Sequence, residues 1–149
     1  MNIMTTWEQT YTVLLDRLRN DGERLTLQRK MVLQALCQGC GHRTIGQIGD
    51  ALHAAGQPLD ESTIYRILQR FNRLGIVSQT YLGADGIVYE LLDGQTHHHL
   101  VCLACHQVLH VDDQFVNDMR TRLRQEYGFE PRIDHLAIFG LCAACQQHI

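Results

Sequence analysis

Histidine and cysteine side chains crowd one short segment of this chain. Residues 95–110, QTHHHLVCLACHQVLH, contain five histidines and two cysteines. Imidazole nitrogens and thiolates are the side-chain ligands that transition metals prefer in proteins. All six cysteines fall into pairs with the same spacing, Cys37/Cys40, Cys102/Cys105 and Cys142/Cys145. The residue types and their spacing therefore predict a metal-binding protein.

Two of the cysteine pairs have the spacing of zinc knuckles. Cys102 and Cys105, together with Cys142 and Cys145 far downstream, can close a tetrahedral four-thiolate zinc site. Such a site has no open coordination position, so it stabilises the fold and performs no chemistry. Disulfides and redox-active thiols are the alternatives, but nothing else in the sequence looks secreted. The pair Cys37/Cys40 has no partner pair, and we interpret it mainly as packing.

The histidine triplet predicts a second, different site. If HHHLVC is extended, His97 and His99 lie on one face of the strand and His98 on the other. Two imidazoles on one face are suited to chelating an ion. Further donors are available along the chain, at His42, at Glu90, which ends a predicted strand, and at His110, on the predicted returning strand.

Helices and a hairpin must position these ligands in the first half. Apolar residues recur at helical spacing over 11–18, over 27–37 after Thr26, and over 45–55, where Thr44 and Gln47 match a capping box. A fourth helix is predicted within LDESTIYRILQRFNRLGIV, with Asp60 or Ser62 as its cap and Gly75 as its stop. VSQTYLGADGIVYELL then predicts a β-hairpin. This order of elements is typical of a winged helix-turn-helix, which binds duplex DNA.

The fourth predicted helix carries a basic stripe. Opposite its apolar face lie Tyr65, Arg66, Gln69, Arg70 and Arg73. Arginines on a recognition helix can contact base edges or phosphates in a major groove. An ordinary solvated basic face is the alternative, and this helix taken alone favours that alternative. The order of the elements favours DNA binding.

Charge and composition are consistent with two modules. The 149 residues carry a net charge of −3, but residues 1–80 hold nine Lys/Arg against seven Asp/Glu, whereas residues 81–149 hold four against nine. No apolar run approaches the ~20 residues of a membrane helix. The first residues lack the basic and apolar regions of a secretory signal. We therefore expect a cytoplasmic protein that does not bind membranes.

Three stretches carry a resemblance to a known family. ESTIYRILQRFNRLGIV, YELLDGQTHHHLVCLAC and the late GLCAAC together resemble the ferric uptake regulator family of metal-sensing bacterial repressors, which includes zinc, manganese, nickel and peroxide sensors. The resemblance extends from about residue 10 to the end of the chain. It implies an α+β fold with a winged-helix DNA-binding domain over residues 1–91, a hinge over 92–97, and a small α/β dimerisation and metal-binding domain over 98–149.

The resemblance also implies roles for single residues. The structural zinc ligands fall on Cys102, Cys105, Cys142 and Cys145, and the regulatory metal ligands on His42, Glu90, His97 and His99, with His110 where many members have a carboxylate. A second regulatory site would use Thr96, His98, Asn117 and His135, of which only His98 and His135 are good ligands. The DNA contacts would be Arg24 in the minor groove and Tyr65 and Arg66 on the recognition helix, to which the basic stripe adds Arg70.

The expected function is a metal-dependent, DNA-binding transcriptional repressor that controls metal homeostasis genes. We expect a homodimer, or a higher oligomer on DNA, on a palindromic operator, with residues 115–128 and 135–141 as the dimer surface. Three histidines and one carboxylate suit Fe²⁺, Mn²⁺, Zn²⁺ or Ni²⁺ by ligand type, and Zn²⁺ or Mn²⁺ are the main alternatives to Fe²⁺. The absence of cysteine between Glu90 and His99 favours iron, although Cys40 could add a thiolate; zinc-sensing and peroxide-sensing members are the alternatives.

Two other classes of function also use clustered cysteines and histidines. A zinc-dependent hydrolase or deaminase would need an H-x-E or H-E-x-x-H motif, and neither occurs in the sequence. A dithiol redox protein would place its C-x-x-C at the start of a helix in a βαβ pattern, whereas Cys102 and Cys105 lie between β-rich segments. We therefore expect neither an enzyme nor a small-molecule substrate.

Overall fold

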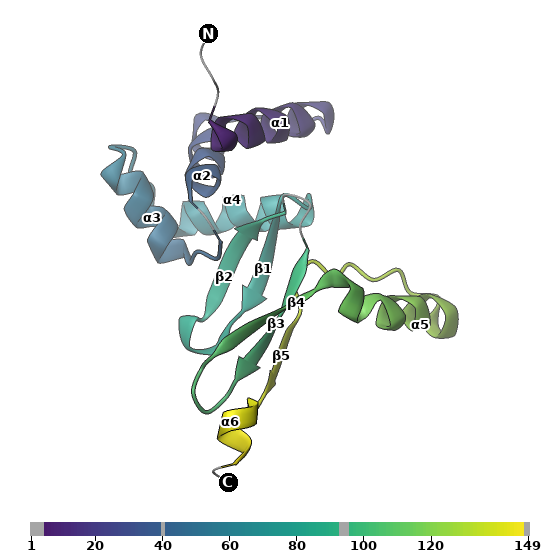
Figure 1. Ribbon diagram of the computed structural model, residues 1–149. Coiled ribbons are helices and arrows are strands. Elements are labelled where there is room, and N and C mark those ends of the chain that lie inside the picture. The colour runs from purple at the N-terminus through teal and green to yellow at the C-terminus, as the bar shows by residue number, and fades with distance from the viewer. Residues whose placement is uncertain (1–4, 40, 93–95, 148–149) are drawn as a thin grey trace. The chain divides into compact units, whose positions relative to one another are not determined.

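The structure is a computed structural model that describes residues 5–39, 41–92 and 96–147 (Figure 1). It divides into two compact units. The first comprises residues 5–79 and 88–92, and the second comprises residues 80–87 and 96–147. The expected domain boundary near residue 91 and the hinge over 92–97 stay predictions, since residues 93–95 lie outside the described part of the chain.

The first unit contains four helices, and local sequence signals explain where each begins. They are α1 (Thr6–Asn20), α2 (Leu27–Gln38), α3 (Ile45–Ala54) and α4 (Glu61–Arg73). Thr26 accepts a hydrogen bond from the backbone N–H of Arg29, and Asp60 accepts one from that of Thr63. Thr44 and Gln47 form the predicted capping box of α3. Each cap satisfies a backbone N–H that the first helical turn leaves without a partner.

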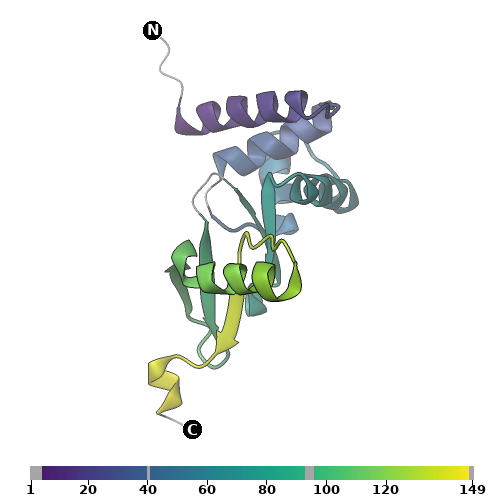
Figure 2. The same ribbon diagram turned by 90° about the vertical axis from the view of Figure 1, so that its right-hand side faces the viewer.

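The core of this unit lies between the helices, and α1 runs alongside α2 (Figure 2). Each helix contributes the apolar face that its periodicity predicts, and the residues exposed by 2% or less are Leu18, Val32, Leu33, Ile48, Leu52, Ile64, Leu68, Phe71, Ile76, Val77 and Tyr89. Burying one such side chain contributes roughly 1.5–3 kcal/mol. This core holds α4 so that its opposite face, with Tyr65 and Arg66, stays exposed.

The predicted hairpin is present. Strands β1 (Val77–Tyr81) and β2 (Ile87–Leu91) flank a short 3₁₀ turn, η1 (Gly83–Asp85), within the stretch LGADG. Gly83 and Gly86 adopt φ values of 66° and 71°, a region that favours glycine because it has no Cβ. One partner of β2 was not predicted: Arg43 and Tyr89 exchange backbone hydrogen bonds of 2.9 and 2.8 Å.

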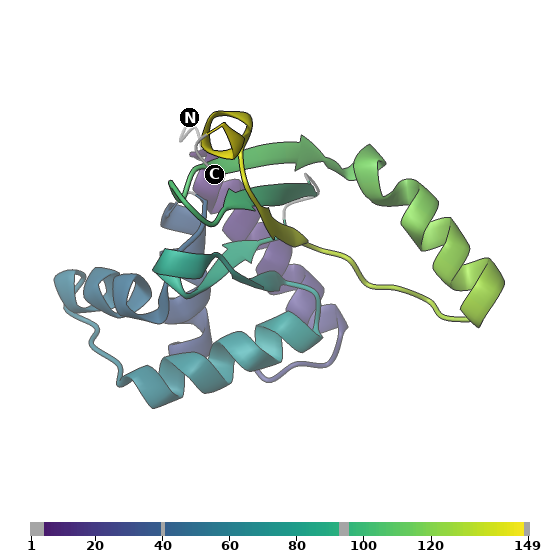
Figure 3. The same ribbon diagram turned by 90° about the horizontal axis from the view of Figure 1, so that it is seen from below.

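The second unit contains a three-stranded sheet and one long helix. Its elements are β3 (His97–Cys102), β4 (Val108–Asp112), η2 (Asp113–Val116), α5 (Asn117–Tyr127), β5 (Ala137–Gly140) and α6 (Ala143–Gln146). The strand order is β4-β3-β5, with β3 antiparallel to β4 and parallel to β5. Figure 3 shows the chain leaving α5 and returning as an extended segment to β5. The elements confirm the predicted α+β class.

Across residues 5–39, 41–92 and 96–147, no helix combines the length and the apolar character that a bilayer span requires.

Candidate metal centres

Four cysteine thiols converge in the second unit. Cys102 ends β3, Cys105 follows in the turn, Cys142 precedes α6 and Cys145 lies within it. The parallel register of β3 and β5 pairs Cys102 with Gly140, which brings the late cysteines beside the early ones. The four Sγ atoms all lie within 4.8 Å of one another. The structure therefore assembles the predicted set of ligands.

The electrostatics of this cluster favour a bound cation. Backbone N–H groups, first that of Cys105 and then that of Cys142, lower the pKa of the Cys102 thiol to about 6. The pKa of Cys145 is instead raised to about 12, mainly because its thiol hydrogen-bonds to the sulfurs of Cys142 and Cys105. Four thiols so close together cannot all ionise unless a positive charge offsets their repulsion. A divalent cation such as Zn²⁺ fits this donor set.

Three imidazoles converge elsewhere in the same unit. His97 and His99 project from one face of β3, as predicted, with their ring centroids 4.9 Å apart. The ring of His135, just before β5, lies 4.6 Å from that of His97 and 5.5 Å from that of His99. One ring nitrogen of each of the three lies within 4.8 Å of the others. These residues can therefore share one ion.

His110 was expected at the regulatory site and His135 at the second site, and the structure places both differently. His110 pairs with His99 across the sheet, and the two rings are 5.0 Å apart, but His110 is exposed. Among the described residues it does not belong to the group of converging ligand atoms, whereas His135 does. Sequence reasoning missed this place of His135 because it depends on β5 pairing with β3, where Ala137 lies opposite His99.

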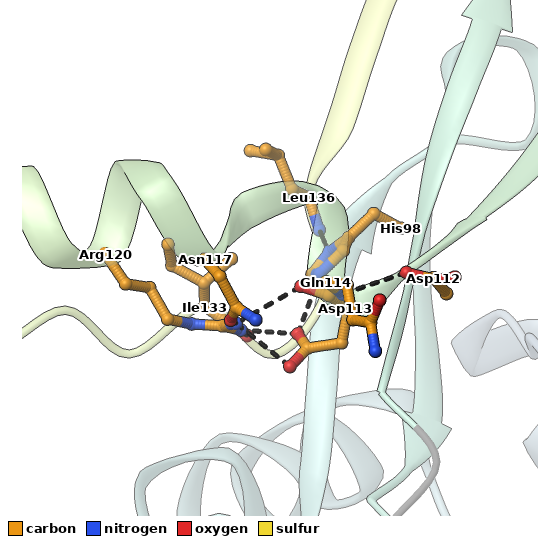
Figure 4. A network of polar contacts seen from close by, with 8 residues as sticks. All are labelled: His98, Asp112, Asp113, Gln114, Asn117, Arg120, Ile133 and Leu136. Carbon is orange, nitrogen blue, oxygen red and sulfur yellow. Dashed lines mark hydrogen bonds and ion pairs between the residues drawn. The ribbon is translucent and has the colours of Figure 1, made fainter.

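His98 is not available to a metal. Its side chain is fully buried, and its Nδ1 accepts a 3.0 Å hydrogen bond from the backbone N–H of Leu136. Its Nε2 lies 3.0 Å from Oδ1 of Asp113 and, in that tautomer, donates to it (Figure 4). Both ring nitrogens are therefore engaged. In the part of the chain that the structure describes, the group of converging ligand atoms that contains His135 does not include His98, so the second site stays a prediction.

The first unit contributes a separate pair of donors. Nε2 of His42 lies 2.9 Å from Oε2 of Glu90, and both side chains are largely buried. The antiparallel bridge between Arg43 and Tyr89 places these two neighbours opposite each other. An imidazole beside a carboxylate supplies two of the ligand types that the sequence assigned to the regulatory metal. Cys40, the thiolate considered for the same metal, lies outside the described residues.

The candidate DNA contacts of the first unit fall into two groups. Tyr65 and Arg66 are exposed on α4, and Arg24 is exposed in the loop between α1 and α2. Arg70 instead forms an ion pair with Glu23, which also pairs with Arg29 at 3.1 Å. The hydrogen bond from Arg70 is the main reason why the pKa of Glu23 is lowered. Arg70 therefore has a structural role in this unit that the basic stripe did not predict.

Helices followed by a hairpin, four converging thiols and a histidine cluster are the features expected of a metal-dependent, DNA-binding transcription regulator. Comparison with known proteins narrows this class. The model of the Ferric uptake regulator family matches residues 20–139. The ferric uptake regulation protein of Legionella pneumophila is 31% identical over 131 residues, which are 87% of this chain and 96% of that protein.

Solved structures agree with this match. The ferric uptake regulator of Pseudomonas aeruginosa, solved with manganese, is 28% identical with a TM-score of 0.69, over 87% of this chain and 97% of that one. A zinc uptake regulator solved with zinc and DNA is 25% identical with a TM-score of 0.66, over 97% of this chain and 98% of that one. The chain belongs to the ferric uptake regulator family.

Proposed function

We propose that this protein is an iron-responsive transcriptional repressor that controls metal homeostasis genes. Its regulatory cation is bound by His97, His99 and His135 of the second unit, and the resemblance to the family adds His42 and Glu90 of the first unit as further ligands. The observation that carries the proposal is the convergence of three imidazole nitrogens within 4.8 Å, one of them on a side chain with no exposed surface. Such a cluster would be unfavourable for protonated histidines and is suited to a shared metal.

The proposed switch acts through the orientation of the two units. His42 and Glu90 belong to the first unit, whereas the other three ligands belong to the second. In this proposal a bound cation links the two units by coordinating ligands from both. The ligands then hold the winged-helix unit so that Tyr65 and Arg66 of two protomers meet the half-sites of a palindromic operator. Metal and DNA raise each other's affinity by the same factor, and such coupling is typically ~1–3 kcal/mol.

The four cysteines have a different proposed role. Cys102, Cys105, Cys142 and Cys145 hold a structural Zn²⁺ that links the end of β3 to α6. Support comes from the convergence of their sulfurs and from the opposite pKa shifts of Cys102 and Cys145. In this proposal the zinc stabilises the dimerisation unit of a cytoplasmic homodimer and does not exchange during sensing.

The ligand set limits which metal can act at the regulatory site. Four imidazoles and one carboxylate suit Fe²⁺ and Zn²⁺ better than Mn²⁺, which prefers oxygen ligands. The similarity to ferric uptake regulation proteins supports iron. A zinc-responsive repressor is the second candidate, and the match to the zinc uptake regulator over nearly the whole chain favours it.

A DNA-binding titration tests the function and the metal together. An operator is first selected from a random duplex library with metal-loaded protein. Binding to it is then measured at buffered free concentrations of Fe²⁺, Zn²⁺, Mn²⁺ and Ni²⁺. We expect Fe²⁺ to raise DNA affinity within the range of free Fe²⁺ that growing cells maintain, whereas Zn²⁺ and Ni²⁺ should act only above their own, much lower, cellular free concentrations. Equal DNA affinity with and without every metal would overturn the proposal.

Variants of the histidine cluster identify the site. The double variant His97→Ala and His99→Ala should keep its fold and its structural zinc but lose the metal-dependent gain in DNA affinity. His53→Ala removes an exposed histidine of α3 and is the matched control, for which we expect the wild-type response. An unaltered response in the double variant would exclude these residues from the switch.

A further inference from the structure

The guanidinium of Arg120 lies where several oxygen atoms converge (Figure 4). Its Nη1 donates to Oδ2 of Asp113 at 2.9 Å and to Oδ1 of Asn117 at 3.1 Å. Its Nη2 donates to Oδ1 of Asp113 at 2.5 Å and to the carbonyl oxygen of Ile133 at 3.0 Å. Only 15% of the Arg120 side chain is exposed. The oxygens surround the cationic group much as they would surround a bound ion.

Helix position alone would disfavour a cation here. Arg120 is the fourth residue of α5, and the N-terminal end of a helix dipole repels positive charge. The two hydrogen bonds to Asp113 form a bidentate pair, which is the strongest arrangement between arginine and a carboxylate. These bonds offset the unfavourable position, and the first cause of the lowered pKa of Asp113 is its hydrogen bond from Arg120. The position of Arg120 therefore depends on its pairing with Asp113.

The same carboxylate connects Arg120 to the strand of the histidine cluster. Oδ1 of Asp113 is shared between Arg120 and the buried His98 of β3. His98 in turn accepts from the N–H of Leu136, whose carbonyl oxygen accepts a 2.7 Å hydrogen bond from the N–H of His99. One polar network thus joins β3, η2, α5 and the segment 133–136.

The network surrounds the proposed metal ligands in the sequence. His97 and His99 are the neighbours of His98, and His135 lies between Ile133 and Leu136, which both contact the network. A strand or segment held at one residue has little freedom at the next. The polar network therefore restrains the backbone of all three imidazole ligands.

We propose that Arg120 is a built-in cation that positions the regulatory metal ligands. Its permanent charge holds Asp113 and His98, and through them the backbone at His97, His99 and His135, in place before any metal binds. The inference rests on the proposed function, because it concerns the affinity of the site proposed there. Partners behind the ligands typically change metal affinity by ~10–100-fold when they are removed. Arg120 is a positioning residue and does not touch the metal.

The test compares Arg120→Ala with Arg122→Ala. Arg122 lies on the same helix, is 72% exposed and pairs with Glu126 one turn away, so its variant removes an equal charge without disturbing the network. Co²⁺ is titrated into protein whose four-cysteine site holds zinc and whose histidine cluster is empty. The visible absorption of Co²⁺ then reports binding at the histidine cluster. We expect Arg120→Ala to weaken Co²⁺ binding by ~10–100-fold with unchanged zinc content, and Arg122→Ala to bind as the wild type does.

Chemical rescue distinguishes loss of the Arg120 guanidinium from a general loss of structure. Low millimolar guanidinium chloride should restore the Co²⁺ affinity of Arg120→Ala, whereas sodium chloride at the same concentration should not. If Arg120→Ala does not fold, Arg120→Gln replaces it, since glutamine keeps a polar side chain but carries no charge. Wild-type Co²⁺ affinity in the variant that folds, or no rescue of a folded Arg120→Ala, would overturn the proposal.

The same titration distinguishes the two proposals. If the wild type binds no Co²⁺ beyond its structural zinc, the proposed regulatory site is wrong. If the wild type binds Co²⁺ and the Arg120 variants bind it equally well, only the positioning role is wrong.

Discussion

Replacing Arg66 with alanine tests whether α4 is the helix that contacts DNA. Arg66 is exposed, and within the described part of the chain it forms no ion pair; its guanidinium contacts only the hydroxyl of Thr63, at 3.4 Å. That contact is too long to contribute much. The free energy of unfolding should therefore change by less than about 0.5 kcal/mol, as is usual for a surface substitution. Any large effect on DNA affinity must come from the interface.

The size of that effect depends on what Arg66 contacts. An arginine paired with a base edge contributes ~1–3 kcal/mol, and the homodimer proposed above would present two copies to its operator, so that complex should lose ~2–6 kcal/mol. This range corresponds to a decrease in affinity of roughly 30-fold to 10⁴-fold. A phosphate contact would instead weaken binding to all sequences about equally and reduce the slope of the salt dependence by about one for each copy.

Fluorescence anisotropy with a labelled operator and a scrambled duplex, at saturating metal and several salt concentrations, measures both quantities. Arg122→Ala removes the same charge from the second unit and should bind as the wild type does. Arg70→Ala should differ from Arg66→Ala, because it leaves Glu23 without its main partner and lowers stability as well as binding. If Arg66→Ala bound both duplexes with wild-type affinity, the assignment of α4 as the recognition helix would be refuted.

Three further predictions concern stability. Leu68→Ala should lower the free energy of unfolding by ~3 kcal/mol, because it leaves a cavity in the core. Leu27→Ala, at a site that is 70% exposed, is the control and should cost little. Urea unfolding monitored by the fluorescence of the single tryptophan, Trp7, measures both, and equal losses would contradict the core assignment. Because the hydrogen bond from Arg70 lowers the pKa of Glu23, its stabilising contribution is present above the unfolded value near 4.5 and is lost as pH falls through the lowered folded value. Glu23→Gln should therefore unfold with a shallower pH dependence in acid, and an unchanged acid transition would argue against this ion pair. Cys142→Ser should lose the tightly held zinc in metal analysis, and a full complement of zinc in that variant would exclude Cys142 as a ligand.

Sequence patterns predicted the elements whose signals are local. Caps at Thr26, Thr44 and Asp60 act within one helical turn, so the starts of α2, α3 and α4 could be derived from a few adjacent residues. The alternation of His97, His98 and His99 needed only the assumption of a strand. The spacing of the cysteine pairs was informative because a knuckle is also a local structure.

Contacts between distant residues could not be derived in this way. The place of His135 depends on the register of β5 against β3, and that of Glu90 beside His42 depends on a bridge between Arg43 and Tyr89. No local pattern indicates either pairing. The polar role of His98 was missed for the same reason, since Asp113 and Leu136 lie 15 and 38 residues away.

Strand β3 connects the two candidate metal centres within one unit. It begins with His97 and His99 and ends with Cys102, so the polar network of Arg120 restrains its start and the four thiolates restrain its end. A shift of one residue in the pairing of β3 would exchange its two faces and replace the ligands with the buried His98. Both restraints therefore act against a shift in the register of β3. It follows that removing the structural zinc should weaken the regulatory site. By the same coupling the regulatory metal tightens zinc binding, but the four-thiolate site holds zinc so tightly that the zinc should stay in place when the regulatory metal is removed.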